Sequence, residues 1–181
     1  INLFDQFNIQ LLDLDKNNYK KFDLLLIPGV GRFDHLIRFI KKNKLINGIE
    51  YNFFKKKILG ICLGMQIIFE ESEEAVHEKG LGFEKGNIVK IDKNQINIGW
   101  SKLENKRNIM RSFTNQDYFY FVHSYHVNSK NDNFISSKIS FNNQKLTATY
   151  TSKNFIGTQF HPEKSSHSGI KFFSVLFDKW L

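Results

Sequence analysis

The chain has 181 residues, a length typical of one domain with a substantial core. Hydrophobic residues make up 41% and charged residues 24%, as in ordinary globular proteins. A single cysteine excludes an intramolecular disulfide and suits a reducing compartment, so we expect a cytoplasmic protein. No run has the length of a transmembrane helix and no signal-peptide pattern is present, so we expect no membrane association.

The net charge of +8 raises the question of nucleic-acid binding. The lysines are scattered among Asn, Ile and Phe, and the clusters at 41–42 and 55–57 flank predicted elements, as solvated faces do. No basic-aromatic motif accompanies them. We therefore expect no nucleic-acid partner.

The first third of the chain predicts strands and helices in alternation. Strands are predicted at 9–14 and at 23–27, the second being a continuous apolar run typical of burial on both faces. Apolar residues recur at helical spacing over 33–42, and a second helix is predicted over 45–54. This alternation favours a parallel sheet with right-handed crossovers.

Residues 57–69, KILGICLGMQIIF, predict a strand, a sharp turn and a helix, with Cys62 at the turn. Gly60 and Gly64 give the cysteine form of the G-x-S-x-G nucleophile elbow, in which small residues let the turn close. The free N–H groups and the dipole at the start of a helix favour a thiolate. The alternative is a buried, inert thiol, the usual state of a lone cysteine.

The segment 159–165, QFHPEKS, supplies the other groups that a nucleophilic cysteine needs. A nucleophile requires a base, and the base requires an orienting carboxylate. His161 and Glu163 stand two residues apart around Pro162, so an extended backbone would point both side chains the same way. Cys62, His161 and Glu163 are therefore the predicted catalytic residues.

The second half of the chain predicts mainly short strands, at 86–91, 96–103, 118–127, 135–141, 146–151 and 155–160. Asn142-Asn143 suits a hairpin turn. Ser165 or Ser166 could cap a final helix, whose predicted core face comprises Ile170, Phe173, Leu176 and Phe177. We expect an α/β fold with a mostly parallel sheet flanked by helices and short antiparallel strands added in the second half. One domain is expected over 1–181.

Four stretches together resemble the class I (triad) glutamine amidotransferases: 27–31 (IPGVG), 60–66 (GICLGMQ), 121–125 (FVHSY) and 161–165 (HPEKS). The resemblance covers nearly the whole chain. Within this family, the chain resembles the glutaminase subunits of imidazole glycerol phosphate synthases most specifically. Three features narrow the resemblance to them: the His-Ser-Tyr stretch, the Lys-Ser pair after Glu163 and the short length of the chain. The resemblance implies a flavodoxin-like sheet and hydrolysis of the glutamine side-chain amide by the triad, without a cofactor.

Further site residues follow from the resemblance alone. Backbone N–H groups of Gly29, Val30 and Leu63 would hold the oxyanion. The residues that would bind glutamine are Gln66, Glu74, Ser124 and Tyr125.

A metal site is the competing interpretation of His123 and His126, which flank Ser124-Tyr125. Metal sites usually take three or four donors, and no matching His, Cys or Asp cluster accompanies this pair. We therefore expect no metal.

The resemblance also implies a heterodimer. Family members pass ammonia to a (β/α)8-barrel cyclase subunit, which makes imidazole glycerol phosphate and an aminoimidazole carboxamide ribotide in histidine biosynthesis. Trp100 and Lys164 are the expected interface residues. Trp is a common interface anchor, but Trp100 could equally be a core residue of its strand.

The chain departs from the family pattern in two places. The opening strand that ends in Asp-Tyr-Gly-x-Gly-Asn is missing, so we expect the native polypeptide to extend before residue 1. Residues 97–101, NIGWS, stand where the family has Pro-His-Met-Gly-Trp-Asn. Three alternatives therefore stay open: a paralogue that supplies ammonia for amidination of a surface-polysaccharide sugar, a cysteine hydrolase, and a non-catalytic binding module.

Overall fold

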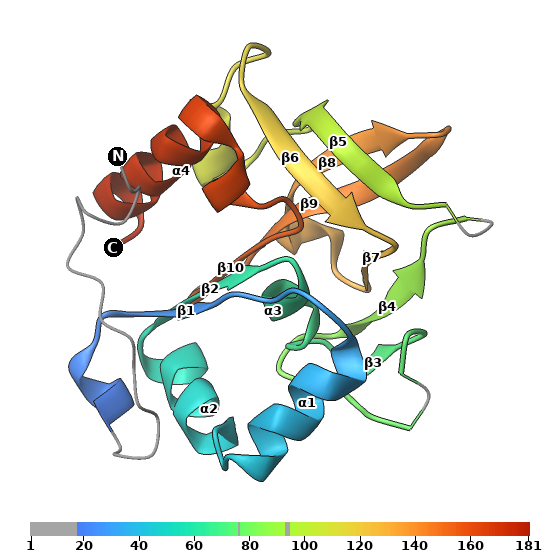
Figure 1. Ribbon diagram of the computed structural model, residues 1–181. Coiled ribbons are helices and arrows are strands. Elements are labelled where there is room, and N and C mark those ends of the chain that lie inside the picture. Colours follow the sequence, from blue (N-terminus) through green and yellow to red (C-terminus); the bar gives the residue numbers. More distant parts are fainter. Residues whose placement is uncertain (1–17, 76, 93–94) are drawn as a thin grey trace.

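The computed structural model describes residues 18–75, 77–92 and 95–181. A five-stranded sheet lies at its centre, in the order β1-β2-β10-β9-β8 (Figure 1). The strands are β1 (Leu24–Ile27), β2 (Lys57–Ile61), β10 (Phe155–Thr158), β9 (Gln144–Thr151) and β8 (Ile135–Phe141). The first three are mutually parallel, whereas β9 and β8 are antiparallel to their neighbours, so the sheet is mixed. The α/β class is confirmed; the strand predicted at 9–14 lies outside the described residues.

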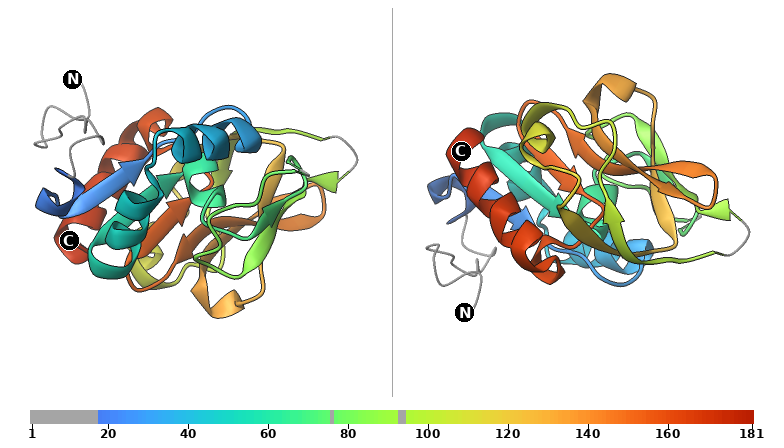
Figure 2. Two further views of the ribbon diagram at one scale, coloured as in Figure 1. Left: turned by 90° about the horizontal axis from the view of Figure 1, so that it is seen from below. Right: turned by 90° about the horizontal axis from the view of Figure 1, so that it is seen from above.

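Helices cover both faces of this sheet (Figures 1 and 2). They are α1 (Phe33–Lys42) and α2 (Ile46–Lys55) on one face and α4 (Ser166–Lys179) on the other. Successive side chains of a strand point to opposite faces. Leu25 and Ile27 accordingly join the core under α1 and α2, while Leu24 and Leu26 pack against the core that contains α4. In the described residues, no helix combines the length and apolar character needed to cross a membrane.

Two smaller sheets flank the centre, as predicted for the second half of the chain. One contains β3 (Glu71–Ser72), β4 (Gly86–Lys90) and β7 (Tyr125–Ser129), and the other contains β5 (Asn97–Lys102) and β6 (Tyr118–His123). The prediction of one continuous strand over 118–127 is wrong. The chain breaks at Ser124, whose carbonyl accepts the Ile91 N–H at 2.8 Å, and β6 and β7 then pair in different sheets.

The helix after the elbow is shorter than the apolar pattern predicts. It is the single turn α3 (Leu63–Gln66), and the predicted continuation to Phe69 is absent. The carbonyls of Ile67, Ile68 and Phe69 accept N–H groups from the loop 81–84 at 2.8–3.1 Å, so the chain after Gln66 pairs with that loop in place of a further helical turn.

Short 3-10 helices complete the structure, at Asn18–Lys21, Asn108–Ser112, Asp132–Phe134 and Pro162–Lys164. The predicted hairpin is confirmed at Asn142 and Asn143, which join β8 to β9 with positive φ values of 45° and 63°.

The final helix differs in detail from its prediction. Ile170 is 43% exposed, whereas the nearby Phe172 is fully buried, so the core face is rotated from the predicted one. The Ser165 side chain makes no cap to α4. Its hydroxyl instead donates to the His161 carbonyl at 2.6 Å and accepts the Tyr120 N–H at 3.0 Å, which fixes the segment that carries His161.

Candidate active site

Cys62 occupies a sharp turn between β2 and α3, with φ 53° and ψ −109°. A non-glycine residue with positive φ is strained, and such strain often marks a functional position. The turn needs small neighbours because the chain approaches itself closely. A Cβ added to Gly64 would lie 1.9 Å from the Ile27 carbonyl oxygen, and one added to Gly60 would lie 2.6 Å from the Gly64 carbonyl oxygen. The predicted strand–turn–helix around the thiol is present.

His161 and Glu163 lie at the carboxyl end of β10, the strand adjacent to β2. The Nδ1 of His161 donates to Oε1 of Glu163 at 2.7 Å, because a carboxylate can only accept. The imidazole is 1% exposed, and the described residues give its Nε2 no hydrogen bond of ordinary geometry. The imidazole nevertheless interacts with the Cys62 side chain, which raises the pKa of His161.

The charged forms of His161 and Glu163 stabilise each other. Burial by itself lowers the pKa of His161, but its interactions with Cys62 and Glu163 outweigh burial and raise that pKa to about 9. Burial would likewise raise the pKa of Glu163, yet its hydrogen bond to His161 brings that pKa below the usual value. The site therefore favours the protonated, imidazolium form of His161.

A cavity of about 440 Å³ opens beside this trio. His161 and Glu163 line it together with Pro28, Gly29, Val30, Leu36 and Ile61. Two of the three predicted oxyanion residues thus face the same space as the base. Leu63 is adjacent to them, because a Cβ added to Gly29 would lie 2.7 Å from the Leu63 Cβ.

The residues predicted to bind glutamine gather around Tyr125. Gln66, 4% exposed, donates from Nε2 to the Tyr125 carbonyl at 3.0 Å. Burial and then the charge of Glu74 raise the pKa of the Tyr125 phenol. Glu74 also accepts the Phe33 N–H at 2.9 Å, at the start of α1, and Ser124 lies at the β6–β7 break.

Two buried side chains of this region, Gln159 and Asn97, are not among the predicted site residues. Gln159 is fully buried and directs Nε2 to the Cys62 sulfur at 3.5 Å. Asn97, 3% exposed, contacts Nε2 of His123 through its amide at 2.9 Å. The sequence could have indicated Gln159, because it is a polar residue in an apolar strand only two positions before His161.

Trp100 and Lys164, the predicted interface residues, lie on different elements. Trp100 is on β5 and 51% exposed, with its ring packed edge-on against Tyr120 at 5.7 Å between centroids. The alternative of a core tryptophan is therefore wrong. Lys164 is exposed at the end of the 3-10 helix that begins at Pro162.

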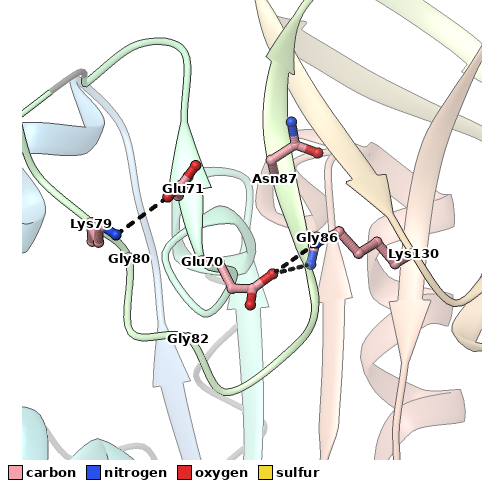
Figure 3. A pocket seen from close by; sticks show the side chains of 8 residues that line it. All are labelled: Glu70, Glu71, Lys79, Gly80, Gly82, Gly86, Asn87 and Lys130. Carbon is pink, nitrogen blue, oxygen red and sulfur yellow. Dashed lines mark hydrogen bonds and ion pairs between the residues drawn. The ribbon is translucent and has the colours of Figure 1, made fainter.

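A second cavity, of about 470 Å³, is lined by Glu70 and Glu71 at β3, by the loop 79–82, by the first residues of β4 and by Lys130 (Figure 3). Its charged groups are largely paired with one another: Lys79 with Glu71 at 3.4 Å and Lys130 with Glu70 at 3.7 Å. It contains neither a nucleophile nor a base from the trio. Within the described ranges, no group of three or more His, Cys, Asp or Glu side chains could hold a metal ion.

Comparison with known proteins shows the class to which this site and fold belong. The family model "Glutamine amidotransferase class-I" matches residues 4–179. The chain therefore belongs to the class-I glutamine amidotransferase family. Within that family it belongs with the HisH subunits of imidazole glycerol phosphate synthase, to which it is similar over most of its length.

Three such relatives illustrate the similarity. The HisH subunit of Prochlorococcus marinus MED4 is 40% identical over 93% of this chain and 84% of that protein. The Pyrococcus furiosus subunit is 38% identical over 86% and 81%, and the Thermotoga maritima subunit is 34% identical over 93% and 81%.

Solved structures support the fold alone. A glutamine amidotransferase crystal structure superposes with a TM-score of 0.70 at 11% identity, covering 99% of this chain and 91% of that one. The glutaminase domain of Trypanosoma brucei CTPS superposes with a TM-score of 0.55 at 15% identity, covering 99% and 84%.

Proposed function

We propose that this chain is the glutaminase subunit of an imidazole glycerol phosphate synthase and that Cys62, His161 and Glu163 perform the hydrolysis. The observation that carries the proposal is the arrangement of the trio: a thiol on a strained turn, a buried imidazole beside it and a carboxylate 2.7 Å from the far ring nitrogen. This is the constellation of nucleophile, base and orienting group that acyl transfer requires.

The reaction proceeds in two steps. His161 Nε2 takes the thiol proton, and the Cys62 sulfur attacks the side-chain amide carbon of glutamine. Backbone N–H groups of Gly29, Val30 and Leu63 stabilise the oxyanion, each contributing on the order of 3 kcal/mol. His161 then protonates the departing ammonia. Water resolves the thioester to glutamate, while Glu163 holds the imidazole in one tautomer.

Binding of the substrate is assigned to the residues around Tyr125. We propose that Glu74 pairs with the α-amino group of glutamine and that Ser124 and Tyr125 hold its carboxylate end, with Gln66 beside them. Gln66, Glu74 and Tyr125 come from three separate segments of the chain. Gln66 nevertheless bonds to Tyr125, and the charge of Glu74 acts on the Tyr125 phenol, which supports a shared binding site.

The partner is proposed to be a (β/α)8-barrel cyclase that uses the ammonia to make imidazole glycerol phosphate in histidine biosynthesis. The relatives are subunits of a synthase, which supports a synthase partner, and an exposed Trp100 supports an interface on β5. We place this single-domain enzyme in the cytoplasm, where its lone thiol stays reduced. The relatives carry the name of the histidine enzyme, which favours it over the sugar-amidination paralogue.

Glutamate release in the presence of the cyclase partner tests the proposal. Wild-type protein should release glutamate, and Cys62→Ala should release none, because the chain contains no other thiol. Glutamine-like affinity labels should modify Cys62 alone. Lys79→Ala, in the second cavity, serves as a control and should retain wild-type turnover. Glutamine hydrolysis by Cys62→Ala would refute the mechanism.

A further inference from the structure

A series of hydrogen bonds between buried groups ends on the Cys62 sulfur. Gln159 donates from Nε2 to that sulfur at 3.5 Å and accepts at Oε1 from Nε2 of Gln66 at 3.0 Å. The Gln66 amide donates in addition to the Tyr125 carbonyl at 3.0 Å. Gln159 and Gln66 are 0% and 4% exposed, so water competes little for these bonds.

The orientation of both amides follows from the one group that cannot be turned around. The Tyr125 carbonyl can only accept, so Gln66 must point its NH₂ group at it. The same NH₂ group faces Gln159, which must therefore present its oxygen to Gln66. The NH₂ group of Gln159 is then left to face the sulfur, and a flipped amide would break the bond to Gln66.

His123 secures the same carbonyl from the other side. Its Nδ1 contacts the Tyr125 oxygen at 2.9 Å and must carry the proton, because a carbonyl accepts. Burial lowers the pKa of His123 to about 4, so the ring is neutral and its Nε2 accepts from the Asn97 amide at 2.9 Å. Each of these hydrogen bonds, from Asn97 through His123, Tyr125, Gln66 and Gln159 to the Cys62 sulfur, thus has an assigned donor and acceptor.

We propose that Gln159 is a positioning residue that donates a hydrogen bond to the Cys62 sulfur, favours its thiolate and holds it toward His161. A thiolate accepts more strongly than a thiol, because hydrogen bonds to ionised groups are the stronger ones. When the S–H bond breaks, its proton goes to His161 Nε2 and the electron pair stays on sulfur, where the Gln159 N–H meets it. The inference rests on the proposed function of Cys62 as the nucleophile.

Alkylation of Cys62 by iodoacetamide, followed against pH, tests the inference without glutamine or a partner. Cys62 is the only cysteine, so total thiol loss reports one site. The titratable group that interacts with Cys62 is His161, which in turn interacts with Glu163 and with His123 of β6. Each profile is normalised to its high-pH plateau, so that altered access to the thiol does not affect the midpoint.

Gln159→Met keeps the volume but removes the donor, and should move the alkylation midpoint up by about one pH unit, a tenfold loss of thiolate near neutral pH. Gln159→Glu keeps the acceptor for Gln66 and places a carboxylate by the sulfur, so its shift should be larger. Ser137→Ala, which removes a different buried hydrogen bond, to Thr149, should leave the midpoint unchanged.

A measurement on the wild-type protein covers the case in which neither variant folds. The side-chain N–H resonances of Gln159 should shift with pH at the alkylation midpoint. Resonances that do not move, or a folded Gln159→Met with the wild-type midpoint, would overturn the inference. Failure of the wild-type protein to hydrolyse glutamine, with the midpoint shift present, would instead refute the proposed function.

Discussion

The proposed nucleophile, Cys62, and the proposed base, His161, are held by backbone hydrogen bonds to neighbouring segments. The Cys62 N–H donates to the Thr158 carbonyl at 2.6 Å, and the His161 N–H donates to the Tyr120 carbonyl at 2.9 Å. Both side chains therefore keep their places through main-chain contacts that most substitutions leave intact. Substitutions of the side chains in this trio should therefore change the activity with little change in the backbone structure.

Glu163→Gln should lower glutamine turnover with the cyclase by roughly tenfold to a thousandfold, because an amide can hold the wrong imidazole tautomer. It should also lower the pKa of His161 from about 9, since the carboxylate helps to raise it. Steady-state kinetics and an NMR titration of His161 measure the two effects. Glu78→Gln, which breaks the surface ion pair with Lys41, is the control. An unchanged His161 titration in Glu163→Gln would contradict the assigned role.

Protonation of His123 should lower the free energy of unfolding in mild acid. Its folded-state pKa of about 4 lies below the ordinary 6.5, so the unfolded chain takes up the proton first. The stabilising contribution is complete above pH 6.5 and is lost as pH falls toward 4, on the order of 3 kcal/mol in all. Urea unfolding across this range should show a shallower pH dependence in His123→Gln, which does not titrate. An equal dependence in both proteins would exclude His123 as the cause.

At the scale of elements, the site depends on how closely β1, β2 and α3 approach one another. The backbone of Gly64 lies against the end of β1, and Gly29, just after β1, lies against Gly64 in turn. Any side chain at these contacts would separate the nucleophile turn from the loop of Gly29 and Val30. Catalytic geometry and packing are therefore coupled at this point.

Gly64→Ala should destabilise the protein by several kcal/mol and abolish turnover, because its Cβ would overlap the Ile27 carbonyl oxygen, which backbone hydrogen bonding keeps in place. Gly48→Ala in α2 is the matched control. The nearest neighbour of its Cβ would be the Tyr19 side-chain ring, at 3.1 Å, and alanine favours a helix by about 0.5–1 kcal/mol. Denaturant unfolding and glutamate release measure both variants. A Gly64→Ala protein as stable and active as wild type would show that the elbow tolerates a side chain.

For the whole molecule, exposed apolar residues of the antiparallel pair β5 and β6 form a surface suited to a partner. Ile98 and Trp100 are 61% and 51% exposed and alternate on one face of β5. Val122 and Tyr120 lie opposite them on β6. Strand β5 also contacts the residues near Cys62. Its first residue, Asn97, is buried and its side-chain amide contacts His123.

Trp100→Ala should weaken binding of the cognate cyclase partner by about thirtyfold, or on the order of 2 kcal/mol, as expected for a central aromatic anchor. Isothermal titration calorimetry measures the affinity, and denaturant unfolding should show nearly unchanged stability because the ring is exposed. Phe39→Ala, an equally exposed aromatic on α1, should bind as wild type does. Equal affinity in Trp100→Ala and Phe39→Ala would remove β5 from the interface.

The sequence by itself determined the class of fold and the residues that we propose for the site. Apolar periodicity located α1 and α2 within a residue or so, because each helix has one buried face that the pattern records. Cys62, His161 and Glu163 were identifiable because they belong to two short local motifs. The thiol lies in the turn motif at 60–64, and the proposed base and carboxylate lie together at 161–163.

Only the tertiary structure decided features that depend on residues distant in the sequence. The end of α3 is set by a loop more than ten residues downstream, and the break at Ser124 by pairing with two different sheets. The exposure of Trp100 depends on what covers β5, which no local pattern records. The contact of Gln159 with the Cys62 sulfur joins residues 97 positions apart. Its hydrogen-bond direction is fixed only once the Tyr125 carbonyl and the Gln66 amide are in place, because an amide has no preferred orientation until its partners are known.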